Sequence, residues 1–170
     1  MLLFRSRRAD GCFAAARALA VSTLAGLMFL GAALAQECPL KSALTVKDTQ
    51  DGFAGQTGTV WTIAPDCSFT VARQIGTKLT DPIKQGRLTR GQEAQLLEQL
   101  ARTAPAEMPS QLSYGPPINA RRITLSYAGK DSVLVLPAGD DLNVLKSTAA
   151  DSPARRLLEL ADSVKSLTGT

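Results

Sequence analysis

The residues of this sequence that could carry chemistry are carboxylates and serines, because its 170 residues include no histidine. Without histidine, neither a Ser-His-Asp triad nor a His-Glu-x-x-His zinc site can form. Asp48 with Asp51, and the adjacent Asp140 and Asp141, could pair as acid and base or hold a hard cation. A small hydrolase that uses these carboxylates is our third hypothesis. It ranks last, because only 5% of the residues are aromatic and Asp140–Asp141 is more simply a turn and helix cap.

Two serines lie beside lysines, the other nucleophile arrangement open to a chain without histidine. Ser132 lies near Lys130, and Ser42 is next to Lys41. Neither spacing forms the Ser-x-x-Lys motif of a helical nucleophile. We expect both serines in turns or at strand edges, and we predict a protein that is not an enzyme and uses no metal or cofactor.

The first 35 residues resemble a bacterial signal peptide. Four arginines lead into an Ala- and Leu-rich run over residues 18–35, which ends on the small-x-small pattern of Ala33 and Ala35. A retained transmembrane anchor is the alternative, since the run is close to the lower length limit of a spanning helix. We expect cleavage after Ala35. Residues 36–170 would then be a single domain exported to the periplasm or the medium, with no stable membrane anchor.

Cleavage would also change the charge of the protein. The full chain has 19 basic and 15 acidic residues, a net charge of +4. The first 35 residues contain four arginines and one aspartate, so residues 36–170 have 15 basic and 14 acidic residues and a net charge of +1. No block of basic residues is left to neutralise phosphates. We therefore predict no nucleic-acid partner.

Two of the three cysteines, Cys38 and Cys67, lie beyond the predicted cleavage site. In an oxidising compartment two such cysteines most often pair with each other. A metal site would need further soft ligands, and a redox pair is usually Cys-x-x-Cys. We predict a structural disulfide between Cys38 and Cys67.

Alternating apolar and polar residues predict strands at residues 57–63, 69–75 and 122–127. Residues 132–136 are apolar on both faces and are expected to form a central strand, and the short apolar run Ala43–Lys47 an edge strand. One face of the first pair contains Trp61 and Ile63, and then Phe69, Val71, Arg73 and Ile75. Residues 76–86 are expected to form a loop or a frayed strand, and the proline-rich residues 105–119 a long irregular connection.

Two amphipathic helices are predicted, and both have clear start patterns. Thr89 with Gln92 matches a capping box before residues 90–104, and Ser152 with Pro153 starts residues 153–168. The expected buried faces are Leu96, Leu97, Leu100, Ala101 and Ala104 in the first helix, and Leu157, Leu158, Ala161, Val164 and Leu167 in the second. We predict an α+β fold, with a single antiparallel sheet of about four to five strands and both helices packed on one face.

The stretch Asp51-Gly52-Phe53-Ala54-Gly55 places one aromatic residue between small ones. One interpretation is a tight turn whose Phe53 folds back under the sheet. The other is a projecting loop that offers Phe53 to a partner, since exposed loops often carry binding residues.

In this stretch and in the order of its elements the sequence resembles the emfourin-like inhibitors of thermolysin-type metalloproteases. The matching residues are Asp51–Gly55, Leu88-Thr89 with Leu96, Leu97 and Leu100, then Ile123-Thr124-Leu125, Val133–Leu136 and Leu157-Leu158. The resemblance spans about residues 43–167. Asp51 stands where the family usually has glycine, residues 57–86 exceed the family's first hairpin, and the disulfide is not a family feature. The resemblance implies a protein that plugs a protease cleft and is not itself an enzyme.

Our first hypothesis is therefore an exported, non-catalytic binding module that acts as a protease inhibitor. Residues Asp51, Gly52, Phe53, Ala54 and Gly55, together with residues 105–119, would be its contact loops. The alternative is a periplasmic structural or accessory protein that binds a partner in the cell envelope.

Overall fold

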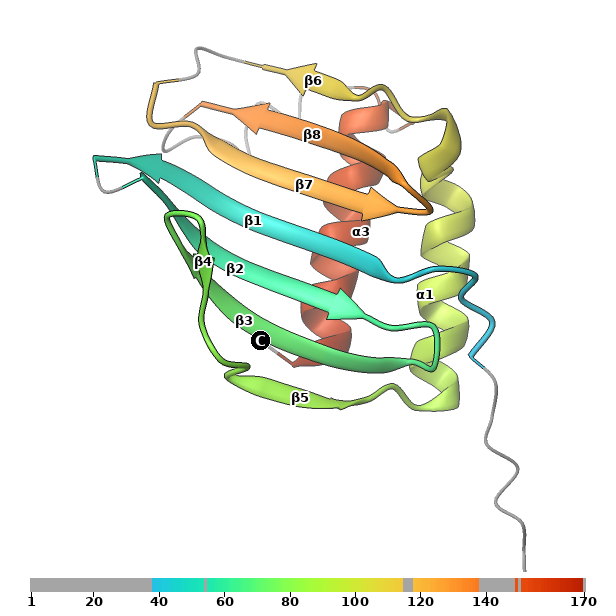
Figure 1. Cartoon of the computed structure of the whole chain (residues 1–170). Helices are drawn as coiled ribbons and strands as arrows, with labels where there is room; N and C mark the ends of the chain where they lie inside the picture. Colours follow the sequence, from blue (N-terminus) through green and yellow to red (C-terminus); the bar gives the residue numbers. More distant parts are fainter. Residues whose placement is uncertain (1–37, 54, 115–117, 138–148, 150, 170) are drawn as a thin grey trace, which may run out of the picture. The chain divides into compact units, whose positions relative to one another are not determined.

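The computed structural model describes residues 38–53, 55–114, 118–137, 149 and 151–169 (Figure 1). All of them belong to one compact unit, Ala35–Thr170. The predicted signal peptide, Ala54 and the pair Asp140–Asp141 lie outside the described residues. Among the described residues, no helix is long and apolar enough to cross a membrane.

Eight strands form one sheet in the order β4-β3-β2-β1-β7-β8-β6, with β5 also paired to β3. The strands are β1 (Leu44–Gly52), β2 (Gly55–Ile63), β3 (Ser68–Ile75), β4 (Lys78–Leu79), β5 (Lys84–Arg87), β6 (Gln111–Ser113), β7 (Arg121–Tyr127) and β8 (Lys130–Leu136). The α+β class is correct, but the prediction of an antiparallel sheet of four to five strands is wrong. The sheet is mixed, because β6 runs parallel to β8. Strands β4, β5 and β6 have only two to four residues each, too few to show a period of two.

Strand β1 is also longer and more central than predicted. It has nine residues and pairs with β2 on one side and β7 on the other, so the expected edge strand at Ala43–Lys47 is wrong. The predicted hairpin of β2 and β3 is confirmed, with Trp61 opposite Val71 and Ile63 opposite Phe69. Trp61 is buried in the core.

Two α-helices of the described residues, α1 (Arg90–Thr103) and α3 (Pro153–Thr168), cover the same face of the sheet (Figure 1). They run antiparallel. Gln92 at the start of α1 donates to the carbonyl of Leu167 near the end of α3, and Arg156 near the start of α3 donates to the carbonyl of Arg102. The core between sheet and helices includes Leu44, Val46, Ile63, Val71, Ile123, Leu134, Leu96, Leu100, Leu157, Leu160 and Val164.

Both predicted helix starts are confirmed. Thr89 and Gln92 form the capping box, and the Ser152 hydroxyl caps α3. The predicted buried face of α3 is correct, but that of α1 is only partly so. Ala101 is exposed, whereas Glu93, expected on the polar face, is buried.

The disulfide between Cys38 and Cys67 is present, with the two Cα atoms 5.3 Å apart. Cys67 lies in the turn between β2 and β3, where it adopts a positive φ of 63°. The bridge fixes the chain before β1 to this turn. It therefore stabilises the end of the sheet opposite the turn between β1 and β2.

Candidate functional site

The hairpin of β1 and β2 projects the predicted contact loop from one end of the sheet (Figure 1). The two strands stay in register up to Gly52 opposite Gly55, and Phe53 lies in the turn between them. Gly55 has a φ of 90°, a backbone conformation that residues other than glycine rarely adopt. The side chain of Phe53 is completely exposed, with a relative accessibility of 110%. The interpretation in which Phe53 folds back under the sheet is therefore wrong.

The base of this hairpin is fixed by Asp51. Its carboxylate accepts from Arg122 Nε at 2.9 Å and from Gln56 Nε2 at 3.1 Å. Its backbone N–H donates to the carbonyl of Ala120 at 2.9 Å. These contacts join β1 to β2 and to the segment before β7. The backbone just before the turn is thus fixed by hydrogen bonds before any partner binds.

The structure does not bring Asp48 and Asp51 together as an acid–base pair. Side chains alternate along β1, so the two carboxylates lie on opposite faces of the sheet. Asp48 points toward α3, where its oxygens accept from Arg121 Nε at 2.8 Å, Arg121 Nη2 at 2.7 Å and Lys165 Nζ at 2.7 Å. The ammonium of Lys165 also lies 5.7 Å from the centroid of the Trp61 ring.

The charge state of Asp48 follows from these contacts. Burial raises its pKa, but the hydrogen bonds from Arg121 and Lys165 and their positive charges outweigh this effect, so the pKa lies below the ordinary value of 3.8. Asp48 is ionised at neutral pH and its oxygens are occupied by two cations. This cluster holds α3 against the sheet and has no acid or base free for catalysis.

The serine and lysine pairs do not form a nucleophile site either. Ser132 is buried in β8, and Lys130 donates its ammonium to the carbonyl of Ala106 at 2.6 Å. Ser42 and Lys41 lie in a bend before β1. Within the described ranges, no three His, Cys, Asp or Glu side chains are grouped as metal ligands.

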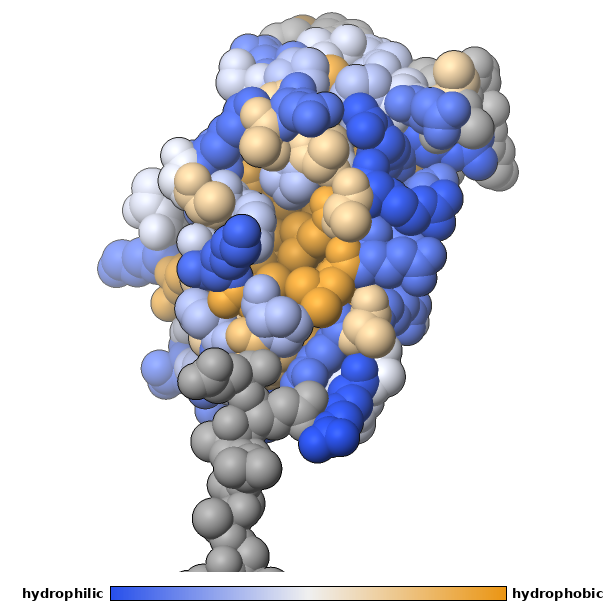
Figure 2. All heavy atoms as spheres, turned by 90° about the vertical axis from the view of Figure 1, so that its right-hand side faces the viewer, coloured by the Kyte–Doolittle hydropathy of each residue, from blue (hydrophilic) through white to orange (hydrophobic). Residues whose placement is uncertain are grey.

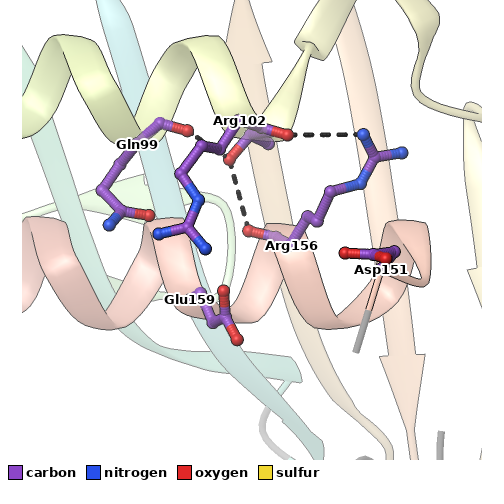
Figure 3. Close-up of a pocket in the computed structure, with 6 residues that line it drawn as sticks. Gln99, Arg102, Asp151, Arg156 and Glu159 are labelled. Carbon is purple, nitrogen blue, oxygen red and sulfur yellow. Dashed lines mark hydrogen bonds between the residues drawn. The ribbon is translucent and has the colours of Figure 1, made fainter. Parts of the chain in front are cut away.

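A polar cavity lies between the end of α1 and the start of α3 (Figure 3). Its volume is about 260 Å³, and it is lined by Gln99, Arg102, Thr103, Asp151, Arg156 and Glu159. Arg156 Nη1 donates to the Arg102 carbonyl at 3.3 Å, one of the terminal carbonyls that lack a partner within α1. Asp151 and Glu159 are about two helical turns apart, on the order of 10 Å, which is wide for a carboxylate pair. The cavity lies between two helices, and its lining contains two acidic and two basic side chains.

A second, more apolar cavity lies where α1 ends beside the turn between β7 and β8. Its volume is about 450 Å³, and its lining is Ala104, Pro105, Ala106, Glu107, Tyr127, Ala128 and Lys130. On the side of the molecule that faces right in Figure 1, hydrophobic residues are exposed between polar ones (Figure 2). The one lysine in the lining of this second cavity, Lys130, donates to the carbonyl of Ala106.

The sequence matches no protein-family model and no curated protein. The candidate site is therefore defined by geometry: a fixed hairpin that carries an exposed aromatic residue. Asp51, Gly52, Phe53 and Gly55 lie together there, and Ala54 is outside the described residues. Of the other predicted contact loop, the structure describes residues 105–114, 118 and 119; it contains β6, and the carbonyl of Asn119 accepts a hydrogen bond from Gln50 in β1.

Proposed function

We propose that this protein is an exported, non-catalytic binding module that inhibits a thermolysin-type metalloprotease through the hairpin of Asp51–Gly55. The observation that supports this proposal is the complete exposure of Phe53 in the turn between β1 and β2. A large apolar side chain in this position contributes nothing to the core. Aromatic residues of this kind are typical anchors of protein–protein interfaces.

The physical advantage of this arrangement is preorganisation. A partner that binds Phe53 need not order the backbone around it, because Asp51 is already bonded to Arg122, Gln56 and Ala120. Moving the phenylalanine side chain from water into an apolar pocket contributes about 2–3 kcal/mol. Removal of that side chain should therefore weaken binding by roughly thirty- to hundredfold.

The resemblance to emfourin-like inhibitors supports the choice of partner. The matched stretch Gly52-Phe53-Ala54-Gly55 is the same stretch that forms the projecting hairpin. An inhibitor also needs no catalytic group of its own. In the predicted contact loop Asp51–Gly55, the acidic side chain of Asp51 is bound to Arg122, which agrees with this role.

The test is a titration of the purified protein, expressed from the full chain with its disulfide intact, against a thermolysin-type protease and a small peptide substrate. We expect stoichiometric inhibition with the inhibitor left uncleaved by mass spectrometry. Phe53→Ala should raise the inhibition constant by roughly thirty- to hundredfold. Ile83→Ala, which truncates another exposed apolar side chain, should leave it unchanged.

Two results would contradict the proposal. Absence of inhibition across several thermolysin-type proteases would exclude the inhibitor and favour the alternative of an accessory protein with an envelope partner. Equal inhibition by Phe53→Ala and the unchanged protein would show that the hairpin is not the contact.

A further inference from the structure

Large hydrophobic side chains that remain exposed are concentrated at the hairpin end of the sheet. Among the described residues they are Phe53 at 110%, Ile118 at 74%, Ile75 at 58%, and Leu79 and Ile83 at 57% each. Ile75 ends β3, and Ile118 lies shortly before β7 begins. The turn between β1 and β2, the end of β3 and the start of β7 all lie at this end (Figure 1).

We propose that Phe53, Ile75 and Ile118 form one three-loop contact surface, here called the tip surface, which fits the extended apolar cleft of a peptidase. This inference rests on the proposed function and adds two flanking contacts to its central one. Sequence alternation places Ile75 on the same face of its strand as Phe69 and Val71. Unlike those two residues, Ile75 is exposed.

The three loops are joined to one another by hydrogen bonds. The Gly76 N–H, next to Ile75, donates to the carbonyl of Gln56 at 2.7 Å. On the other side, Gln50 Nε2 donates to the carbonyl of Asn119, next to Ile118, at 3.1 Å. The loops that carry the two isoleucines are thus fixed to the hairpin that carries Phe53. They form a preorganised surface, which lowers the entropy lost on binding.

The width of the tip surface indicates the kind of partner. Strands β3, β2, β1 and β7 are consecutive neighbours, so β3 and β7 are about 14 Å apart at about 4.8 Å per strand spacing. An extended peptide covers that distance with about four residues at roughly 3.3 Å each. The tip surface therefore matches a cleft that accepts about four substrate residues, with Phe53 in its central pocket.

The charge of the hairpin base indicates that recognition is apolar. Asp51 and Arg122 form an ion pair at 2.9 Å, so each largely neutralises the other. Gln50, Gln56 and Gln74 contribute neutral amides near the three loops. The exposed Lys78, opposite Ile75 in β4, contributes one positive charge. Binding should therefore depend on apolar contact and shape, with little dependence on salt.

The test compares Ile75→Ser and Ile118→Ser with the matched control Ile83→Ser in the same protease titration. Ile83 has nearly the same exposure as Ile75, but it lies at the level of Val71 in β3, away from the hairpin end. We expect each tip variant to raise the inhibition constant roughly five- to tenfold, and the control to change it less than twofold. Unchanged thermal unfolding of all three variants would show that they remain folded.

Each outcome separates this inference from the proposed function. If Phe53→Ala loses inhibition but both isoleucine variants inhibit normally, the tip surface is refuted and the single-anchor inhibitor stands. If the unchanged protein inhibits no thermolysin-type protease, both fail. A steep loss of affinity between about 0.05 and 0.5 M salt would contradict apolar recognition.

Discussion

Substitution of Asp48 tests how the ion cluster around this residue holds helix α3 against the sheet. One carboxylate accepts two hydrogen bonds from Arg121 on β7 and one from Lys165 on α3. Asp48→Asn keeps the size of the side chain but leaves two cations facing a neutral amide. Removal of one partner from a fully buried ion pair costs about 3–5 kcal/mol, and exposed pairs contribute about 0–1 kcal/mol. These side chains are 15–24% exposed, so we expect a loss of about 2–3 kcal/mol at pH 7.

The effect should depend on pH with a defined sign. The pKa of Asp48 in the folded protein lies below the ordinary value of 3.8, because the hydrogen bonds and charges of Arg121 and Lys165 outweigh the effect of burial. The unfolded chain therefore binds this proton more readily. The contribution of Asp48 is complete above pH 3.8 and is lost as the pH falls through the folded pKa. The cost of Asp48→Asn should shrink in the same range.

Urea unfolding at pH 7 and at pH 2.5, followed by the fluorescence of the single Trp61, measures both effects. Asp162→Asn is the control, because Asp162 binds the same Lys165 at 3.3 Å but is 57% exposed. We expect that variant to lose less than about 0.5 kcal/mol. The reasoning is refuted if Asp48→Asn costs no more than Asp162→Asn at pH 7, or costs as much at pH 2.5 as at pH 7.

Two further predictions concern the backbone. Replacing Cys38 and Cys67 by serine opens a loop of 29 residues and should cost about 3–4 kcal/mol, seen as a lower urea midpoint; an unchanged midpoint would contradict this. Gly58→Ala should cost about 3 kcal/mol or more, because its Cβ would overlap the carbonyl oxygen of Asp48. Gly91→Ala in α1 is the control, because a Cβ there meets nothing within 4 Å, and it should leave the melting temperature unchanged or raise it. Equal melting temperatures of the two glycine variants would contradict the expected overlap at Gly58.

The elements with a long one-sided period were predictable from sequence. The hairpin of β2 and β3 and the two helices each bury one face, and a period of 2 or 3.6 residues records that burial directly. The helix starts depend on neighbouring residues, such as Thr89 and Gln92, so they too were predictable.

The extent of β1 was not predictable from local pattern. Beyond Val46, its core-facing position is Asp48, a residue that ends an apolar alternation. Asp48 can face α3 only because Arg121 and Lys165 neutralise it, and these partners lie 73 and 117 residues away in the chain. Among the short edge strands, β4 and β5 lie in residues 76–86, which are expected to form a loop or a frayed strand, and β6 was missed, since such strands take their conformation from the neighbouring strand.

The candidate site was predictable in composition but not in geometry. Gly52 and Gly55 marked a turn around Phe53, yet two opposite placements of its side chain remained open until the register of β1 and β2 was known. For Ile75, alternation gave the face of β3 that it shares with Phe69 and Val71, but not its exposure. A period of two identifies the face of the sheet on which a side chain lies, but not whether the helices on that face cover it.

Stability and binding should be separable in this protein, because their residues occupy different places. Phe53 is completely exposed, so Phe53→Ala removes no packed contact and should leave the free energy of unfolding within about 0.5 kcal/mol of the unchanged protein. Asp48 lies inside the fold, four residues before the turn, and contacts nothing at the tip surface. A folded Asp48→Asn variant should therefore inhibit normally. The Phe53→Ala variant, although as stable as the unchanged protein, should not. If both variants lost inhibition in proportion to their loss of stability, the hairpin would be acting through the fold and not as the contact itself.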